Sequence, residues 1–210
     1  MKVWLVAAML PLAWGLAAAP GFVETFAGPE LGGDWSLDYK VKCSGIAWER
    51  PIKDSLTITG LENARPGAEA YLDRDANYAA GNFRLIAELD FQSAAAGQPG
   101  AFRFQLLTEN GEKLIEGAIE REAPGGPLRI GGNPGHSGRT VARTPLVLSA
   151  PATSGTLSIV RENGHYEVRF NDRAVYTDHG DTAPAASFRL AISGGLGTLV
   201  LKRLTLTTEK

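Results

Sequence analysis

Hydrophobic and polar residues alternate along most of this chain. Between residues 82 and 92, one set of alternate positions is apolar and comprises Phe83, Leu85, Ala87, Leu89 and Phe91. The same alternation returns in residues 101–107, 114–122, 155–161, 165–171, 187–193 and 198–207. Successive side chains of a strand point to opposite faces, so each segment predicts a β-strand with one buried face. No segment shows sustained helical spacing, and we therefore expect an all-β fold.

Short turns separate these predicted strands. Asn163 and Gly164 both tolerate the positive φ angles of a two-residue hairpin turn, and a second turn is expected at residues 171–173. Together the turns predict a meander of three antiparallel strands. Farther on, the apolar spacing changes between Leu201 and Leu204, which indicates a β-bulge between them.

Roughly ten short strands with one apolar face each need a second sheet to cover that face. We therefore predict an antiparallel two-sheet jelly-roll sandwich. Residues 125–138 contain too much Gly and Pro for a strand and are expected to form the longest loop, together with residues 93–100. We find no repeat of fixed period and no linker, so residues 20–210 are expected to form one domain.

The N-terminal segment, residues 1–19, has the pattern of a secretory signal peptide. Lys2 precedes an apolar run over residues 3–16, and three alanines at residues 17–19 offer small side chains for cleavage within a few residues. We therefore expect a bacterial protein of the periplasm or the extracellular space, with no membrane insertion after cleavage.

The composition narrows the possible partners. The 210 residues are 44% hydrophobic, and 21 basic residues face 23 acidic ones, for a net charge of −2. Nucleic-acid binding relies on a basic excess that neutralises phosphates, so nucleic acid is not an expected partner. Cys43 is the only cysteine. It cannot form an intrachain disulfide, and no neighbouring residue indicates a role for its thiol.

Three segments carry a family resemblance. Residues 26–35 read FAGPELGGDW, residues 157–176 read LSIVRENGHYEVRFNDRAVY, and residues 188–207 combine an apolar strand, a Gly-rich turn and a last strand. They resemble the opening, the strand–hairpin–strand unit and the ending of concanavalin A-like lectin and glucanase domains, which include laminin-G-like domains. The resemblance covers almost the whole chain after the leader.

The resemblance implies a jelly roll whose concave sheet commonly holds glycans. Members include sugar-binding modules, β-glucanases, polysaccharide lyases and a bacterial group related to 3-keto-glycoside hydrolases. Many relatives hold a structural calcium ion with an Asp of the last strand. This chain reads Leu-Lys-Arg-Leu at residues 201–204. A calcium ion is possible there, but the two cations argue against it.

The β-glucanase branch uses carboxylates that alternate along one strand. Glu116, Glu120 and Glu122 share a face of their predicted strand, but Ala118 stands where that motif has an Asp. Retaining hydrolysis needs two carboxylates about 5–5.5 Å apart, and Glu120 and Glu122 could approach that separation. The simpler alternative is that the three glutamates belong to a solvated strand face.

No metal or cofactor site is expected. His136, His165 and His179 lie in or beside different turns, without the spacing of a transition-metal site. Residues 73–77 place oxygen ligands at alternate positions but lack the Gly and the distal Glu of a calcium loop. We interpret them as a turn.

A sugar-binding face needs planar polar groups for hydroxyls and an aromatic ring for the apolar side of the sugar. The candidate ligand-binding residues are Trp48, Arg84, Glu88, Asp90, Arg103 and Gln105, with Tyr71 or Tyr78 as a second source of the ring. The plainer alternative places Trp48 in the core and the polar residues on an ion-paired sheet face.

These observations support one leading hypothesis, a non-catalytic carbohydrate-binding module of concanavalin A-like fold. A glycoside hydrolase or polysaccharide lyase that uses paired carboxylates is the alternative. A structural or interaction domain of the cell envelope is the second alternative.

Overall fold

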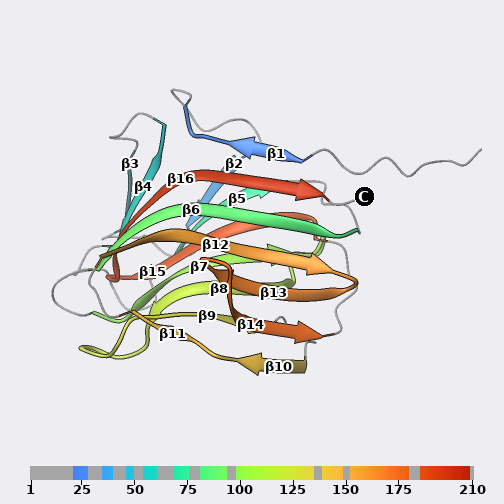
Figure 1. Cartoon of the computed structure of the whole chain (residues 1–210). Coiled ribbons are helices and arrows are strands. Elements are labelled where there is room, and N and C mark those ends of the chain that lie inside the picture. Colours follow the sequence, from blue (N-terminus) through green and yellow to red (C-terminus); the bar gives the residue numbers. More distant parts are fainter. Residues whose placement is uncertain are drawn as a thin grey trace, which may run out of the picture.

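The computed structural model describes residues 21–27, 35–39, 46–49, 54–60, 69–75, 81–93, 98–134, 139–148, 152–179 and 185–208. No helix occurs in these ranges, which form two antiparallel sheets stacked face to face (Figure 1). This arrangement confirms the predicted all-β jelly-roll sandwich.

Sheet A has nine strands in the described part of the chain. Their order is β10 (Arg139–Arg143), β14 (Arg173–His179), β13 (His165–Phe170), β12 (Ala152–Glu162), β6 (Phe83–Ser93), β16 (Gly197–Thr208), β4 (Leu56–Gly60) and β3 (Ile46–Glu49), with β1 (Phe22–Glu24) also pairing with β16. This order places the last strand of the chain beside the long central strand β6.

Sheet B has seven strands in the same ranges. Their order is β11 (Leu146–Val147), β9 (Arg129–Pro134), β8 (Lys113–Arg121), β7 (Gly100–Leu107), β15 (Ser187–Gly194), β5 (Glu69–Asp75) and β2 (Trp35–Tyr39). Strands β6 and β7 follow each other in the sequence but belong to different sheets. The polar side chains of β6 and those of β7 therefore lie on different sheets.

The core lies between the two sheets and is built from the apolar positions of the alternating segments. The Phe91 ring of sheet A meets the Phe102 ring of sheet B edge to face, with centroids 5.8 Å apart. Both side chains are buried. Burying one such side chain stabilises the fold by about 1.5–3 kcal/mol relative to leaving it in water.

The predicted turns and the bulge are confirmed. Asn163 and Gly164 have φ angles of 51° and 79°, and Asn171 and Asp172 have φ angles of 48° and 62°, as two-residue hairpin turns require. They join β12, β13 and β14 into the predicted meander. The pairing of β16 with β6 shifts register after Leu201, where the bulge was expected.

Two predictions about loops were wrong. Residues 125–138 contain strand β9, and close packing rather than a turn explains its Gly132. A Cβ atom on Gly132 would lie 2.6 Å from Cβ of Tyr176, so only glycine fits there. Asp73 belongs to strand β5 and not to a turn, since β5 pairs with β15 through to Asp75.

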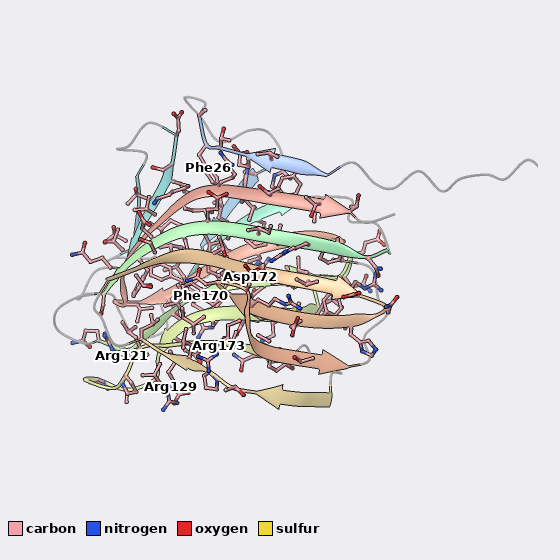
Figure 2. The ribbon with its side chains drawn as sticks, in the orientation of Figure 1. Phe26, Arg121, Arg129, Phe170, Asp172 and Arg173 are labelled. Carbon is pink, nitrogen blue, oxygen red and sulfur yellow. The ribbon has the colours of Figure 1, made fainter. Side chains whose placement is uncertain are left out.

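A buried arginine fastens one end of the sandwich. Arg121, at the end of β8, donates hydrogen bonds to the Gly126 carbonyl (3.1 Å), the Gln98 carbonyl (3.2 Å) and Ser93 Oγ (2.8 Å). Figure 2 shows Arg121 at the end of the sandwich where these segments meet. One side chain thus ties three separate segments together.

Several predictions lie outside the described residues. These are the signal peptide over residues 1–19, the role of Cys43, and the candidates Tyr78 and His136. In the part of the chain that is described, no helix is long and apolar enough to cross a membrane.

Candidate functional site

The predicted binding residues do not form one face. The inward positions of β6 and β7 are buried, so Arg84, Glu88 and Asp90 lie on the outer face of sheet A. Arg103 and Gln105 lie on the outer face of sheet B, on the opposite side of the molecule. Our expectation of a single polar surface is therefore corrected. The sixth candidate, Trp48, lies in β3, and its side chain is outside the described part.

Glu116 is the centre of a polar network on the outer face of sheet B. Gln105 Nε2 donates a 2.7 Å hydrogen bond to Glu116 Oε2, and Asn133 Nδ2 donates a 2.9 Å hydrogen bond to Glu116 Oε1. Lys113 Nζ lies 3.4 Å from Oε2 and Arg103 Nε lies 3.7 Å from Oε1. Only 3% of the Glu116 side chain is exposed. A carboxylate this deeply buried is tolerated because donors surround it.

Strand register extends this network into a row across the sheet. Cross-strand pairing aligns Asp73 with Arg189, Arg189 with Gln105, Gln105 with Glu116, and Glu116 with Asn133. The row crosses β5, β15, β7, β8 and β9. With strands about 4.8 Å apart, four spacings span roughly 19 Å. An extended ligand lying across the strands could contact the partly exposed members, Asp73, Arg189, Gln105 and Asn133.

Asp73 and Arg189 hold each other in a fixed orientation. Arg189 Nε and Nη2 each donate a 2.7 Å hydrogen bond to a different oxygen of Asp73. Such a two-point pair fixes the plane of the guanidinium as well as its position. About a quarter of each side chain remains exposed, at 28% for Arg189 and 20% for Asp73.

A second row runs beside the first and contains small residues. Pairing aligns Tyr71 with Ala191, Ala191 with Arg103, Arg103 with Ala118, and Ala118 with Gly131. Arg103 Nη1 donates a 2.8 Å hydrogen bond to Ser193 Oγ. We call the surface formed by these two rows the Glu116 face.

Tyr71 is locked into this face. Its hydroxyl donates a hydrogen bond to Glu69, and the Arg189 guanidinium lies 4.6 Å from its ring centre. Burial and the hydrogen bond to Glu69 raise the pKa of Tyr71 well above its ordinary value. The phenol therefore stays protonated near neutral pH. Because Arg189 covers the ring, Tyr71 is also a poor stacking platform for a sugar.

The three candidate catalytic glutamates are placed differently from one another. Glu116 and Glu120 are four residues apart on one strand face, which separates them by roughly 13 Å. Glu122 follows the last residue of β8, is 70% exposed, and lies 3.8 Å from Arg129 Nη1 in an ion pair. The stretch from Glu116 to Glu122 thus offers one buried and fully engaged carboxylate, Glu116, one half-buried carboxylate, Glu120, and one at the solvent-exposed strand end, Glu122.

The outer face of sheet A carries two adjoining hollows. The larger, of about 640 Å³, is lined by Thr25, Ala27, Asp54, Ser55, Glu88, Asp90, Val200, Lys202 and Arg203. The smaller, of about 420 Å³, shares Asp90 and Val200 with it. Lys202 Nζ lies 2.6 Å from Asp90 Oδ2 and lowers the pKa of that carboxyl. Arg203 Nη1 lies 3.7 Å from Glu88 Oε1.

Other polar candidates are paired or isolated. Arg84 Nη2 donates a 2.6 Å hydrogen bond to Asp172, which Figure 2 shows in the turn between β13 and β14. His165 begins β13 and is exposed, and His179 lies opposite it in β14. Within the described ranges, no group of three or more His, Cys, Asp or Glu side chains could hold a metal ion.

The sequence reasoning missed three members of the Glu116 face. The sequence could have indicated Arg189. Phe188 and Leu190 on either side of it are apolar and buried, so the side chain of Arg189 points to the outer face. Asp73 was assigned to a turn. Asn133 lies in the Gly-rich segment that was expected to be a loop, so no pattern pointed to it.

Comparisons with known proteins identify the fold. No protein-family model matches the chain, and no curated protein matches it in sequence. The solved structure of the cellulose-induced protein Cip1 is similar, with 9% identity and a TM-score of 0.60 over 90% of this chain and 97% of that chain. The CBM2 module of Lactobacillus casei BL23 phage J-1 evolved Dit has 11% identity and a TM-score of 0.56 over 90% of this chain and 96% of that chain.

A third similar structure is the alginate lyase AlgAT5 of polysaccharide lyase family 7. It has 12% identity and a TM-score of 0.56 over 84% of this chain and 95% of that chain. At such low identity these likenesses establish the fold alone. They agree with the two antiparallel sheets and confirm the fold that the resemblance implied. The chain has the concanavalin A-like jelly-roll fold.

Proposed function

We propose that this protein binds a carbohydrate on the Glu116 face and does not cleave it. The observation that carries the proposal is the network in which Gln105 and Asn133 both bond the buried Glu116 carboxylate. The network fixes amide and guanidinium planes side by side at the surface. Fixed planar groups that both donate and accept hydrogen bonds are the side chains that recognise sugar hydroxyls.

Hydrolysis is the weaker alternative on this face. An acid or nucleophile needs a partner carboxylate within about 5–9.5 Å, and Glu116 is farther than that from Glu120. Glu122, the partner expected for Glu120, is 70% exposed and ion-paired with Arg129. Glu116 already contacts four donors, so both its oxygens serve the network. The carboxylate is better suited to orient its neighbours than to attack a sugar.

A lyase mechanism is also weaker, because it needs a group that removes a proton from the sugar. Among the side chains that the structure describes on this face, Tyr71 is the tyrosine, and its raised pKa disfavours the deprotonated form that would take the proton. An envelope interaction domain would instead need an exposed apolar patch. Among the described residues, the exposed large hydrophobics Val23 and Val147 lie on different sheets.

Two further observations support the proposal. Proteins that share this fold include an alginate lyase and a protein named for its induction by cellulose, which favours polysaccharides as the ligand class. The signal-peptide pattern of residues 1–19 favours the periplasm or the extracellular space, where polysaccharides are met.

The test combines a glycan array with a reducing-sugar assay on the same polysaccharides. We expect retention of at least one oligosaccharide and no release of reducing ends. The double variant Gln105→Ala/Asn133→Ala should weaken binding by at least about tenfold, because two hydrogen-bonding groups are lost. The matched control is Gln92→Ala, an exposed glutamine on the outer face of sheet A. Loss of binding in the control alone would move the site to the hollows of sheet A, and steady release of reducing ends would replace binding with hydrolysis.

A further inference from the structure

The Glu116 face is rich in charge but balanced. The two rows contribute the cations Arg103 and Arg189 and the carboxylates Asp73 and Glu116, and the adjoining Lys113 and Glu69, which bond to Glu116 and Tyr71, add one charge of each sign. Each of these cations lies within ion-pair distance of a carboxylate of the same face. The count of three against three leaves no net charge on this set.

The pairs are also costly to separate. Glu116 is 3% exposed, and Arg103 and Lys113 provide its positive counter-charge. A ligand carboxylate that captured either cation would leave a buried anion with less compensation, which is strongly unfavourable. Capture of Arg189 would break both of its bonds to Asp73. An anionic sugar would also lie close to the carboxylates that pair with these cations. Repulsion between like charges would add to the free-energy cost of binding it.

A neutral sugar makes no such demand. A hydroxyl both donates and accepts a hydrogen bond, so it can bond a carboxylate oxygen and an amide or guanidinium N–H of one ion pair at once. Gln105 uses one amide N–H on Glu116, and its amide oxygen is an acceptor for a hydroxyl. A row of paired charges therefore suits a ligand that presents neutral hydroxyl groups.

We infer, on the basis of the binding function proposed above, that the Glu116 face selects neutral oligosaccharides and rejects those built from uronic acids or carrying sulfate. The ion pairs act as the selective element, because they satisfy each cation before the ligand arrives. The predicted ligand is a neutral chain several sugar units long, lying across strands β5, β15, β7, β8 and β9. Selectivity of this kind comes from the penalty imposed on the wrong ligand.

The test uses hexamers that differ in charge. Neutral hexamers of β-1,4-linked glucose, mannose and xylose are titrated into the full chain, beside hexamers of β-1,4-linked mannuronate and of chondroitin sulfate. The mannose and mannuronate hexamers differ mainly in the carboxylate at C6. We expect binding of a neutral hexamer that changes less than about twofold between low and high salt, because screening affects only charged partners. The mannuronate hexamer should bind at least about tenfold more weakly, because its carboxylate can bond a cation of this face only by breaking a charged hydrogen bond within the protein.

A variant checks the cause of the selectivity. Asp73→Asn removes the carboxylate that occupies Arg189 while keeping the size of the side chain. The mannuronate hexamer should then gain at least about tenfold in affinity, with strong salt dependence. Asp172→Asn, which removes a carboxylate from the exposed Arg84 pair on sheet A, is the matched control and should change nothing.

The outcomes separate the two proposals. Salt-sensitive binding of the mannuronate or sulfated hexamer to the unmodified protein would overturn the inference and leave carbohydrate binding intact. Binding of neither class would overturn both. Unchanged rejection of mannuronate by Asp73→Asn would also overturn the inference, because the ion pair would not be the selective element.

Discussion

Gln105 on β7 donates a 2.7 Å hydrogen bond to Glu116 on β8, directly across the ladder that pairs the two residues. Backbone register and side-chain bonding thus reinforce each other at this point. Since Asn133 approaches Glu116 from the other neighbouring strand, three adjacent strands converge on one buried carboxylate. This relationship underlies the predictions for stability and for binding.

Removal of the Glu116 carboxylate should destabilise the protein. Glu116→Ala removes the acceptor shared by the amides of Gln105 and Asn133 and by the cations Arg103 and Lys113. This loss should lower the free energy of unfolding by about 2–3 kcal/mol. Urea unfolding measures the change. The control Glu122→Ala removes an exposed, ion-paired glutamate at the end of the same strand and should shift stability by less than about 0.5 kcal/mol. Equal losses in both variants would contradict the account.

Two adjacent glycines of β9 should respond differently to alanine. A Cβ atom on Gly132 would lie 2.6 Å from Cβ of Tyr176, whereas a Cβ atom on Gly131 would first meet Pro145 at an ordinary 3.5 Å. Gly132→Ala should therefore lower the free energy of unfolding by about 1–3 kcal/mol through overpacking. Gly131→Ala should stay within about 0.5 kcal/mol. Thermal unfolding of the two variants, compared side by side, decides whether packing explains these glycines.

The stability of the protein should fall in alkali because of Tyr71. Its folded-state pKa is raised above the ordinary 10.0, so the unfolded chain releases this proton first. The stabilisation is fully present below pH 10.0 and is lost as the pH rises through the higher folded value. Tyr71→Phe should lack this component of the alkaline loss. Urea unfolding from about pH 8 to about pH 11 tests it, and parallel curves for the two proteins would refute it.

The Arg121 side chain should protect the segments that it fastens. Arg121→Met keeps much of the apolar stem but removes hydrogen bonds to Ser93, Gln98 and Gly126, and should cost about 2–3 kcal/mol. Hydrogen exchange should accelerate around Gly126 more than in the β12–β13 hairpin. Arg173→Met, in an exposed position, is the control. Uniform acceleration along the chain would show that Arg121 does not act locally.

Much of the fold could be predicted from the sequence because alternation reports directly on burial. It gave the correct inward and outward faces of β6 and β7, and Asn163 with Gly164 gave the correct turn. Period two identifies the face of a strand but not its sheet. Arg84 and Gln105 therefore looked like neighbours, although the chain crosses between sheets after Ser93.

The candidate site was harder to predict because it depends on contacts between distant strands. Glu116 was identified, but as a catalytic candidate, since nothing in the sequence shows that Gln105 and Asn133 surround it. The pair of Asp73 and Arg189 joins residues 116 positions apart, and only strand register brings them together. The sequence around a glycine that packs against an aromatic ring, such as Gly132, looks the same as the sequence of a Gly-rich loop.

The most direct measurement of the central claim is the map of backbone amide chemical shifts during titration with an oligosaccharide that the array retains. Binding on the Glu116 face predicts that the perturbed amides cluster on β7, β8, β9 and β15, around Gln105 and Glu116. The chemical shifts of the amides around Asp90 and Val200 should not change. A cluster on β6 and β16 instead, or no perturbation at saturating ligand, would contradict the claim.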